Sequence, residues 1–560
     1  MPGSGAPMKT VRIFCAILLT VMLLGSAWLA LEYPNSVAYS EDPGARPTLD
    51  QFGGVLVKVN ETNKYFTVKK LSNRWVFVTP EGHPFWMLAV FNVQPARSYN
   101  VKYPDSRTWG EHTATRLRTW GFNALAMSPS IYVLPENVKD KLPYTFNLWP
   151  SYYGLTNNGN YAPAPFKDLV DCLDATYTGY RGGSTPDVFD PNFTAYVDGR
   201  LKSGQTDSIW GPILRSPWNL GITTDDADQL FGFGPGPEIP GEDGVTQPHI
   251  GWFAIAASPA KSSSSKWGVK YTDSMVHTKY ALRDFLVSRY RGSIDALNSA
   301  WRSNYTSFDS AGGYGAGSGL LDENGRHDWL GTRDGSLKRA NSAVVADLDA
   351  FLYAYAKHYF FTVTSRIKQY YPNHLVFGPA TLNGHGGLTR RQVLNAAGQY
   401  VDVLNAGITP RLLEKTVQYA GDIPIITWEG YVSNPDSALY QSPNPSQPWA
   451  YGTQPERARA YKHKLDYLFN ATTKSGAKPV VGIQYWEWAD NWSEKLNWGL
   501  VTFRENAYDG KEAAKALGQD PRGFATGGEG KDFGDFISDV RNTNADILGR
   551  FVKDLTPIRK

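Results

Sequence analysis

The sequence contains few of the residues that form disulfide bonds or bind structural metal ions. Its 560 residues include two cysteines, Cys15 and Cys172, and nine histidines. Cys15 lies in an apolar run near the N-terminus, so a chain that loses this run keeps one thiol and no internal disulfide. The cysteines and histidines also lack the spacings typical of zinc sites. We therefore predict a fold held by its hydrophobic core, with no bound metal and no cofactor.

An excess of charge of one sign is also lacking. The formal net charge is +3, which gives no electrostatic case for binding nucleic acid. Aromatic residues, in contrast, make up 14% of the chain, with 18 tryptophans and 32 tyrosines. Such rings either fill a large core or stack on the C–H faces of sugar rings in a cleft. Composition alone does not decide between these two interpretations.

Long apolar runs are limited to one segment near the N-terminus. Lys9 and Arg12 precede an apolar run from Ile13 to Leu31, and Ser36-Val37-Ala38 follows as a site of small residues. This pattern is typical of a signal peptide cleaved after Ala38, so we expect a secreted or periplasmic protein. The run is also nearly long enough to span a bilayer, and an uncleaved membrane anchor through residues 13–31 is the alternative.

The remaining chain divides by composition into three parts. Residues 39–64 are predicted to be a linker and the beginning of an N-terminal β region, because residues 41–50 are polar and contain Pro43 and Pro47. Residues 65–510 alternate between strand and helix patterns, with insertions rich in glycine at 231–270 and 310–335. Loops of this length are usually functional or disordered, and we interpret the first as a lid. Residues 511–560 are predicted to be a C-terminal helical extension.

The strand–helix alternation predicts the fold class. A hairpin of residues 65–68 and 74–78 leads into short apolar strands, predicted at 84–90, 121–127, 218–224, 374–378, 400–405, 424–430 and 479–486. Helices between short apolar strands indicate a parallel sheet. About eight such strands without a glycine-rich dinucleotide motif favour an α/β fold of the (β/α)8 TIM-barrel type, with long βα-loop insertions and a short N-terminal β-hairpin region.

Polar and aromatic residues accumulate where these strands end, which is where a barrel carries its chemistry. The candidates for binding substrate hydroxyl groups at the strand ends are Asn92, Asp225, His385 and Asn405. Trp486, Trp488 and Trp492 are candidate sugar platforms, although each ring could equally be packing in a core or loop. Glu487 alternates with the first two tryptophans, so we expect it to point away from the pocket. Glu429 follows its strand as a lone carboxylate, which is either an ion-pair partner or a catalytic group.

Six short motifs occur in one order along the chain. They are Trp75–Phe85, Gly121–Asn123, Asp187–Pro191, Ser293–Trp301, Tyr371–Leu375 and Val481–Trp486. In these motifs the chain resembles the agarase-type, β-galactosidase-like glycoside hydrolases of the retaining (β/α)8-barrel clan, over roughly residues 70–510. The resemblance implies an exported enzyme that cleaves β-linked, galactose-containing, agar-like poly- or oligosaccharides. It also implies two catalytic carboxylates, an acid/base after strand four and a nucleophile after strand seven, and Glu429 matches the nucleophile.

The end of strand four departs from the family pattern, which has a glutamate there. The segment Thr224–Asp228 carries three aspartates and no glutamate. We rank Asp226 and Asp228 above Asp225 as the acid/base, with Glu238 as an outside candidate. An aspartate is one methylene shorter, so the backbone or the substrate must come closer. Like-charge repulsion within the cluster would raise the pKa of the acid.

Other interpretations of this cluster and of the chain remain open. The aspartates could form an Asx-rich turn or a cation site. The missing glutamate motivates a second function, a catalytically impaired barrel that only binds glycan. A third is a structural protein anchored at the cell surface through residues 13–31.

Overall fold

The computed structural model describes most of the chain after residue 47. The described ranges are 48–59, 61–127, 129–148, 165–169, 185–225, 258–263, 273–310, 319–322, 342–380, 389–427, 432–435, 451–491, 497–512 and 535–555, with a few shorter pieces between them. The expected signal peptide and the apolar segment 13–31 lie outside these ranges. In the part of the chain that the structure describes, no helix is both long and apolar enough to cross a lipid bilayer.

Eight parallel strands form the centre of the molecule and confirm the predicted (β/α)8 barrel. In chain order they are β4 (Met87–Phe91), β5 (Ala124–Ala126), β6 (Tyr144–Asn147), β9 (Asn219–Thr223), β12 (Leu375–Phe377), β13 (Leu404–Asn405), β14 (Ile425–Thr427) and β15 (Val480–Tyr485). Strand order in the sheet follows chain order, and β15 pairs with β4. A parallel bridge from Phe377 to Val403 joins β12 to β13, so the circle closes.

The barrel strands are short and apolar, as expected for strands buried on both faces. All residues of β4, β9, β14 and β15 are buried. At Gly482 in β15, an added Cβ would lie 2.4 Å from the Cβ of Met87 on β4. Only glycine therefore allows β15 and β4 to approach this closely at that position.

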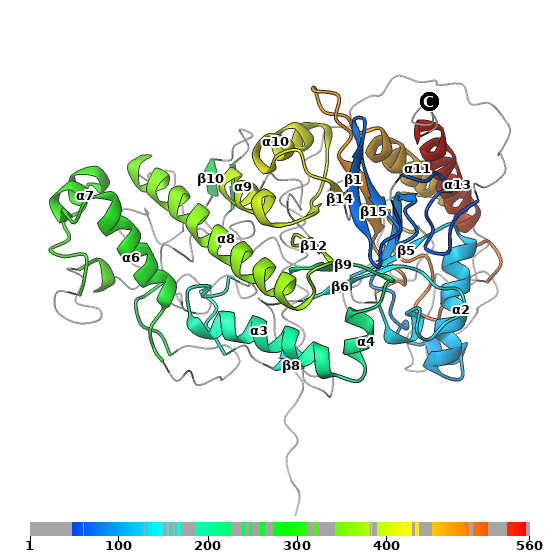
Figure 1. Ribbon diagram of the computed structural model, residues 1–560, viewed down its shortest axis with the longest axis horizontal. Coiled ribbons are helices and arrows are strands. Elements are labelled where there is room, and N and C mark those ends of the chain that lie inside the picture. Colours follow the sequence, from blue (N-terminus) through cyan, green and yellow to red (C-terminus); the bar gives the residue numbers. More distant parts are fainter. Residues whose placement is uncertain are drawn as a thin grey trace, which may run out of the picture.

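Helices cover the outside of the barrel after most strands (Figure 1). In chain order they are α2 (Ser106–Thr119), α3 (Pro191–Thr206), α4 (Trp210–Leu214), α6 (His277–Arg289), α7 (Ile294–Trp301), α8 (Ser342–Tyr370), α9 (Arg391–Tyr400), α10 (Pro410–Ala420), α11 (Gln454–Asn470) and α13 (Phe536–Leu555). Between β5 and β6 the described residues contain only one 3-10 turn, η2 (Ile131–Val133). Helices α6 and α7 lie at the far end of the molecule from α2 and α13.

The C-terminal helix α13 packs beside α11 as part of the helical layer (Figure 1). The side chain of Asn544 on α13 donates from Nδ2 to the carbonyl of Trp120 at 3.0 Å, and its Oδ1 accepts from the hydroxyl of Tyr461 at 2.7 Å. Because α13 follows β15, it occupies the place of the eighth barrel helix. The two hydrogen bonds of Asn544 tie α13 to the barrel.

A small antiparallel sheet covers the N-terminal end of the barrel. It consists of β1 (Thr67–Leu71), β2 (Arg74–Val78) and β3 (Pro84–Phe85), which is the predicted hairpin leading into the first barrel strand. Residues 48–55 lie against it, and Phe52 contacts the rings of Phe66 and Trp218. This arrangement closes the end of the barrel opposite to the one expected to carry the chemistry.

Two further short antiparallel sheets lie in the loops. They are β7 (Gly154–Leu155) with β8 (Tyr161–Ala162), and β10 (Glu238–Pro240) with β11 (Thr246–Pro248). The β10–β11 hairpin falls in the insertion after strand four, within residues 231–270. The insertion therefore has secondary structure of its own.

Candidate active site

The carboxyl ends of the barrel strands bring four of the predicted site residues to one end of the molecule. Asn92 follows β4, Asp225 follows β9, Asn405 ends β13, and Trp486 follows β15. In a parallel barrel these ends share one rim, so residues distant in sequence become neighbours. Asp226, Asp228, His385, Glu429, Trp492 and the side chain of Glu238 lie outside the described residues.

Asn92 and Glu487 join the ends of strands one and eight. Asn92 Nδ2 donates a hydrogen bond to Glu487 Oε2 at 2.9 Å. Asn92 has a φ of 51°, a left-handed conformation that asparagine tolerates better than most residues. Glu487 is buried, with 2% of its surface exposed, and it points toward Asn92. Glu487 therefore stabilises the rim, and sequence alternation did not reveal this contact.

Among the described tryptophans that follow strand eight, Trp486 is the one that keeps an accessible surface. It is half-buried, and its ring centroid lies 4.4 Å from that of Phe91 at the end of β4, with an interplanar angle of 47°. Phe91 thus supports the indole, and the exposed part of the ring is accessible to solvent. Stacking on a sugar needs an exposed aromatic surface, and Trp486 has some exposed surface.

Trp488 differs from Trp486 because protein surrounds it on every side. Its exposed fraction is 0%, it stacks on Trp120 with centroids 5.6 Å apart, and its Nε1 donates to Glu505 at 3.1 Å. A ring without an exposed face cannot stack on a sugar. We therefore leave Trp488 out of the substrate surface and assign it to the support of the rim.

Asp225 is also enclosed by the protein. Its Oδ2 accepts from the hydroxyl of Tyr359 on α8 at 3.0 Å, and its carbonyl accepts from the backbone N–H of Ala380 at 3.0 Å. Burial, and secondly the Asp225 carboxylate, raise the pKa of Tyr359, so the phenol keeps its proton and remains a donor. These contacts fix the end of strand four to α8 and to the loop after β12. They favour a positioning role for Asp225 over direct contact with substrate.

Asn405 lies inside the barrel below the rim. It is fully buried, and its Oδ1 accepts from Gln484 Nε2 on β15 at 3.1 Å. In the part of the chain that the structure describes, Asn405 Nδ2 has no hydrogen-bond partner. A buried amide donor of this kind is able to bind a ligand oxygen or water at the mouth of the barrel.

Glu505 is a buried carboxylate that the sequence analysis missed. Its Oε1 accepts from the backbone N–H of Ala96 at 2.8 Å, and the Arg116 guanidinium lies 4.0 Å from its Oε2. Burial raises the pKa of Glu505 to about 7, against the opposing effect of the Ala96 N–H and of Arg116. The segment Arg504-Glu505 carries no motif, and no sequence signal could have identified this group.

Strand seven ends immediately before the candidate nucleophile. β14 consists of Ile425, Ile426 and Thr427, and residues 432–435 are the next described piece of chain. The carbonyl of Val432 accepts from Arg457 Nε at 3.1 Å. Glu429 therefore belongs to a short connection whose two flanking backbone segments are held by the protein.

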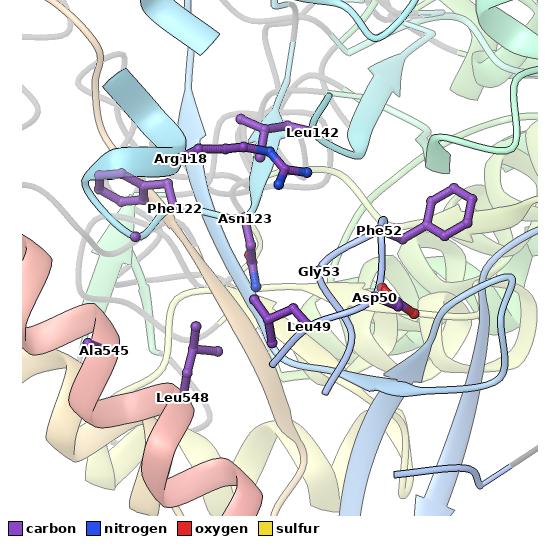
Figure 2. A pocket seen from close by; sticks show the side chains of 11 residues that line it. Leu49, Asp50, Phe52, Gly53, Arg118, Phe122, Asn123, Leu142, Ala545 and Leu548 are labelled. Atoms are coloured by element: carbon purple, nitrogen blue, oxygen red, sulfur yellow. The ribbon is translucent and has the colours of Figure 1, made fainter. Parts of the chain in front are cut away.

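The other end of the barrel holds two features without a link to this rim. A cavity of about 140 Å³ lies between residues 49–53, the segments that precede β5 and β6, and α13. Phe122, Asn123, Leu142, Ala545 and Leu548 are among the residues that line it (Figure 2). Among the described residues, Asp50, Glu81 and His83 alone form a group able to hold a cation. Asp50 Oδ2 already accepts from Thr79 Oγ1 at 2.6 Å and contacts His83 Nδ1 at 2.9 Å. These hydrogen bonds explain the group without a metal.

Comparisons with known proteins agree with the motifs and with the fold. No model of a known protein family matches the chain. Beta-agarase A of Vibrio sp. (strain JT0107) is 24% identical over 326 residues, which cover 56% of this chain and 25% of that protein. Beta-agarase B of the same strain is 21% identical over 528 residues, covering 81% and 48%. The chain thus spans about a quarter and about half of the lengths of these relatives.

Solved structures show the same fold. An exo-beta-agarase superposes with a TM-score of 0.60 at 18% identity, covering 91% of this chain and 68% of that one. The structure of PfGH50B gives a TM-score of 0.59 at 18% identity, covering 90% and 69%. The chain therefore resembles agarase-type glycoside hydrolases in sequence and in its barrel, as the six motifs indicated.

Proposed function

We propose that the protein is an exported glycoside hydrolase that cleaves β-linked, agar-like galactose-containing poly- or oligosaccharides. Two facts together carry this proposal: the chain is similar to beta-agarases, and side chains suited to binding sugar gather at the carboxyl end of its barrel. At that end the proposed aromatic platform, Trp486, lies on the same rim as the ends of strands four and seven. The sequence places carboxylates directly after both of these strands.

The proposed reaction uses two carboxylates in two steps. Glu429 attacks the anomeric carbon while Asp228 or Asp226 gives its proton to the departing glycosidic oxygen, so one C–O bond forms as the other breaks. The same aspartate then takes a proton from water, which displaces Glu429 and releases the sugar. This retaining mechanism requires carboxyl groups about 5–5.5 Å apart.

Trp486, Asn92, Asn405 and His385 are the proposed substrate contacts. The half-buried Trp486 supplies a flat apolar face. Asn405 has an amide donor below the rim, and Asn92 is partly exposed beside Glu487. His385 enters the proposal from the sequence alone.

Release of reducing sugar tests this function. The chain from residue 39 onward is incubated with β-linked galactans, agar oligosaccharides and β-glucans, beside Glu429→Gln and the matched control Glu136→Gln, which changes an exposed carboxylate. The proposal expects cleavage of agar oligosaccharides by the wild type and by the control, and none by Glu429→Gln. Equal cleavage by all three proteins would remove Glu429 from the mechanism.

A glycan-binding barrel without catalysis is the second candidate. The absence of a glutamate from Thr224–Asp228 favours it, because the usual acid/base is missing there. Asp226→Asn and Asp228→Asn distinguish the two. Loss of oligosaccharide cleavage in one variant would identify the acid/base if azide restores turnover of a substrate whose leaving group departs without a proton, because azide replaces only the base-activated water of the second step. Binding of oligosaccharide by the wild type without any turnover would support the second candidate.

Export is proposed from residues 1–38. N-terminal sequencing of the protein recovered outside the cytoplasm separates cleavage after Ala38 from retention of the 13–31 segment as an anchor.

A further inference from the structure

Arg457 is fully buried at the carboxyl end of the barrel, and the proposed mechanism gives it no role. It lies in the first turn of α11, whose start is fixed by a capping box of Thr453 and Glu456. Its exposed fraction is 0%. No ion pair involves Arg457 within the described ranges. A buried cation without a carboxylate partner is costly unless other acceptors replace water.

Backbone carbonyls of two different loops supply these acceptors. Arg457 Nε donates to the carbonyl of Val432 at 3.1 Å, which lies just after the Glu429 connection. Arg457 Nη2 donates to the carbonyls of Trp498 at 3.1 Å and Gly499 at 2.8 Å, in the loop after strand eight. One guanidinium therefore joins the loop of strand seven to the loop of strand eight.

Aromatic side chains hold the guanidinium in this orientation. Its carbon lies 3.9 Å from the ring centroid of Phe536 on α13, and Nη2 also donates to the hydroxyl of Tyr485 on β15 at 2.9 Å. The Tyr485 hydroxyl donates in turn to the carbonyl of Trp498 at 2.7 Å. A lysine could not make these divergent contacts, because its ammonium is a single point of charge.

A second set of hydrogen bonds reinforces the same junction. Asn497 Nδ2 donates to the carbonyl of Asn434 at 3.0 Å, and the Asn434 N–H donates to the carbonyl of Asn497 at 2.8 Å. Gln454, the first residue of α11, donates from Nε2 to Asn434 Oδ1 at 2.7 Å. Residues 432–434 are thus fixed from α11 and from the loop after β15.

We propose that Arg457 is a positioning residue that fixes the strand-seven loop, and with it the Glu429 carboxylate, against the strand-eight loop. Glu429 follows Thr427 of β14 by two residues and precedes Val432 by three, and the described backbone on both sides is held by β14 pairing and by Arg457. The proposal rests on the function proposed above. Placement of a nucleophile to within a fraction of an ångström is worth large factors in rate, since a displacement of about 1 Å can cost about 10²-fold.

The chain offers a matched control in Arg74. This arginine of β2 is also buried, lies 4.3 Å from an aromatic ring centroid (Phe469), and donates to the carbonyl of Phe469 at 3.0 Å. It contacts α11 and α13 at the opposite end of the barrel, where it pairs with Asp554. Loss of Arg74 therefore reports the structural cost of removing a buried guanidinium, without effect on the Glu429 loop.

The experiment compares Arg457→Gln, Arg457→Lys, Asn497→Ala and Arg74→Gln in kcat and KM on an agar oligosaccharide, below the unfolding temperature of each variant. We expect Arg457→Gln to lower kcat by about 10²-fold with KM within about threefold. Arg457→Lys should recover part of this loss in kcat. Asn497→Ala removes side-chain contacts from a half-buried site, and it should also lower kcat. Arg74→Gln should lower the unfolding temperature and leave both constants within about threefold. Equal kcat values for Arg457→Gln and Arg74→Gln would overturn the proposal. If Arg457→Gln does not fold, the test depends on the two milder variants. An unchanged kcat in both Asn497→Ala and Arg457→Lys would then overturn the proposal.

Hydrogen exchange separates this proposal from the proposed function. Peptides that cover residues 425–435 should exchange faster in Arg457→Gln and Asn497→Ala than in the wild type, and at the wild-type rate in Arg74→Gln. This result requires no turnover, so it holds even if the wild type releases no sugar and the hydrolase assignment fails. Unchanged exchange over residues 425–435 in Arg457→Gln and Asn497→Ala would contradict the positioning role.

Discussion

Asn92 Nδ2 donates a hydrogen bond of 2.9 Å to Glu487 Oε2, which joins the first and last strands of the barrel at the end that carries the proposed active site. The barrel closes between β4 and β15 by backbone pairing. The Asn92–Glu487 contact continues this closure beyond the last backbone pair, and it sets the rim beside Trp486.

Substitutions at Asn92 should separate the hydrogen bond from the backbone conformation. Asn92→Gly removes the bond to the buried carboxylate and should cost about 1.5–3 kcal/mol of unfolding free energy. Asn92→Ala should cost about 1 kcal/mol more, because alanine is strained at a φ of 51°. Urea unfolding measures both values. Equal stabilities for the two variants would show that the left-handed backbone is not maintained.

The two tryptophans of the rim should respond in different ways. Trp486→Ala removes the half-exposed platform and should raise KM for an oligosaccharide about tenfold, since an aromatic contact contributes about 1–1.5 kcal/mol. Trp488→Phe should leave KM unchanged and lower stability by about 1–3 kcal/mol, because Glu505 loses its indole donor. Steady-state kinetics and thermal unfolding distinguish these outcomes. A raised KM in Trp488→Phe with no loss of stability would reverse our assignment.

Glu505 should make the protein less stable as pH rises. Burial raises its pKa to about 7, above the ordinary value of 4.5, so between these values the folded state holds a proton that the unfolded state releases. The stabilisation that this bound proton provides is fully present below pH about 4.5. It is lost as pH rises through about 7, which lowers the free energy of unfolding by up to ~3 kcal/mol. Glu505→Gln should remove this slope. A wild-type slope that persists in the variant would assign it to another group.

His374 should make the protein less stable as pH falls, which is the opposite of the effect of Glu505. It is buried between the rings of Tyr65 and Tyr371, and burial, followed by Lys368 and Lys64, lowers its pKa to about 4. The unfolded state therefore binds the extra proton between pH 4 and 6.5, and up to ~3 kcal/mol of stability is lost as pH falls through this window. His374→Phe should abolish that loss.

The two opposing slopes give a joint test by urea unfolding between pH 4 and 7. The wild type should show a shallow dependence, His374→Phe should lose stability with rising pH, and Glu505→Gln should lose it with falling pH. The same slope in both variants would contradict these pKa shifts.

The sequence predicted the barrel because its signals are local. β2 was expected at residues 74–78 and has these bounds, because its apolar pattern and the flanking turn residues specify it. The motif Asp187–Pro191 likewise has a local explanation: Asp190 caps α3, and Asp187 accepts from the first N–H groups of α6. The seven strands predicted from the sequence do not include strand three, which the structure places at Tyr144–Asn147 as β6.

The environment of the site could not be predicted, because it depends on contacts between distant segments. Nothing near Arg457 in the sequence indicates that it binds carbonyls at Val432 and Gly499. Trp486 and Trp488 look equivalent in sequence, and only the approach of Trp120 and Glu505 buries the second. The same limit applies to Glu487, whose partner Asn92 lies 395 residues away.

The anomeric configuration of the first product tests the central claim most directly. Proton NMR follows a β-linked agar oligosaccharide in the first minutes of reaction with the chain from residue 39 onward. Our account predicts that the β-anomer appears first and the α-anomer only later by mutarotation, since two displacements retain configuration. Initial formation of the α-anomer would contradict the roles of Glu429 and the strand-four aspartates, and binding without any cleavage would show that the barrel is not a hydrolase.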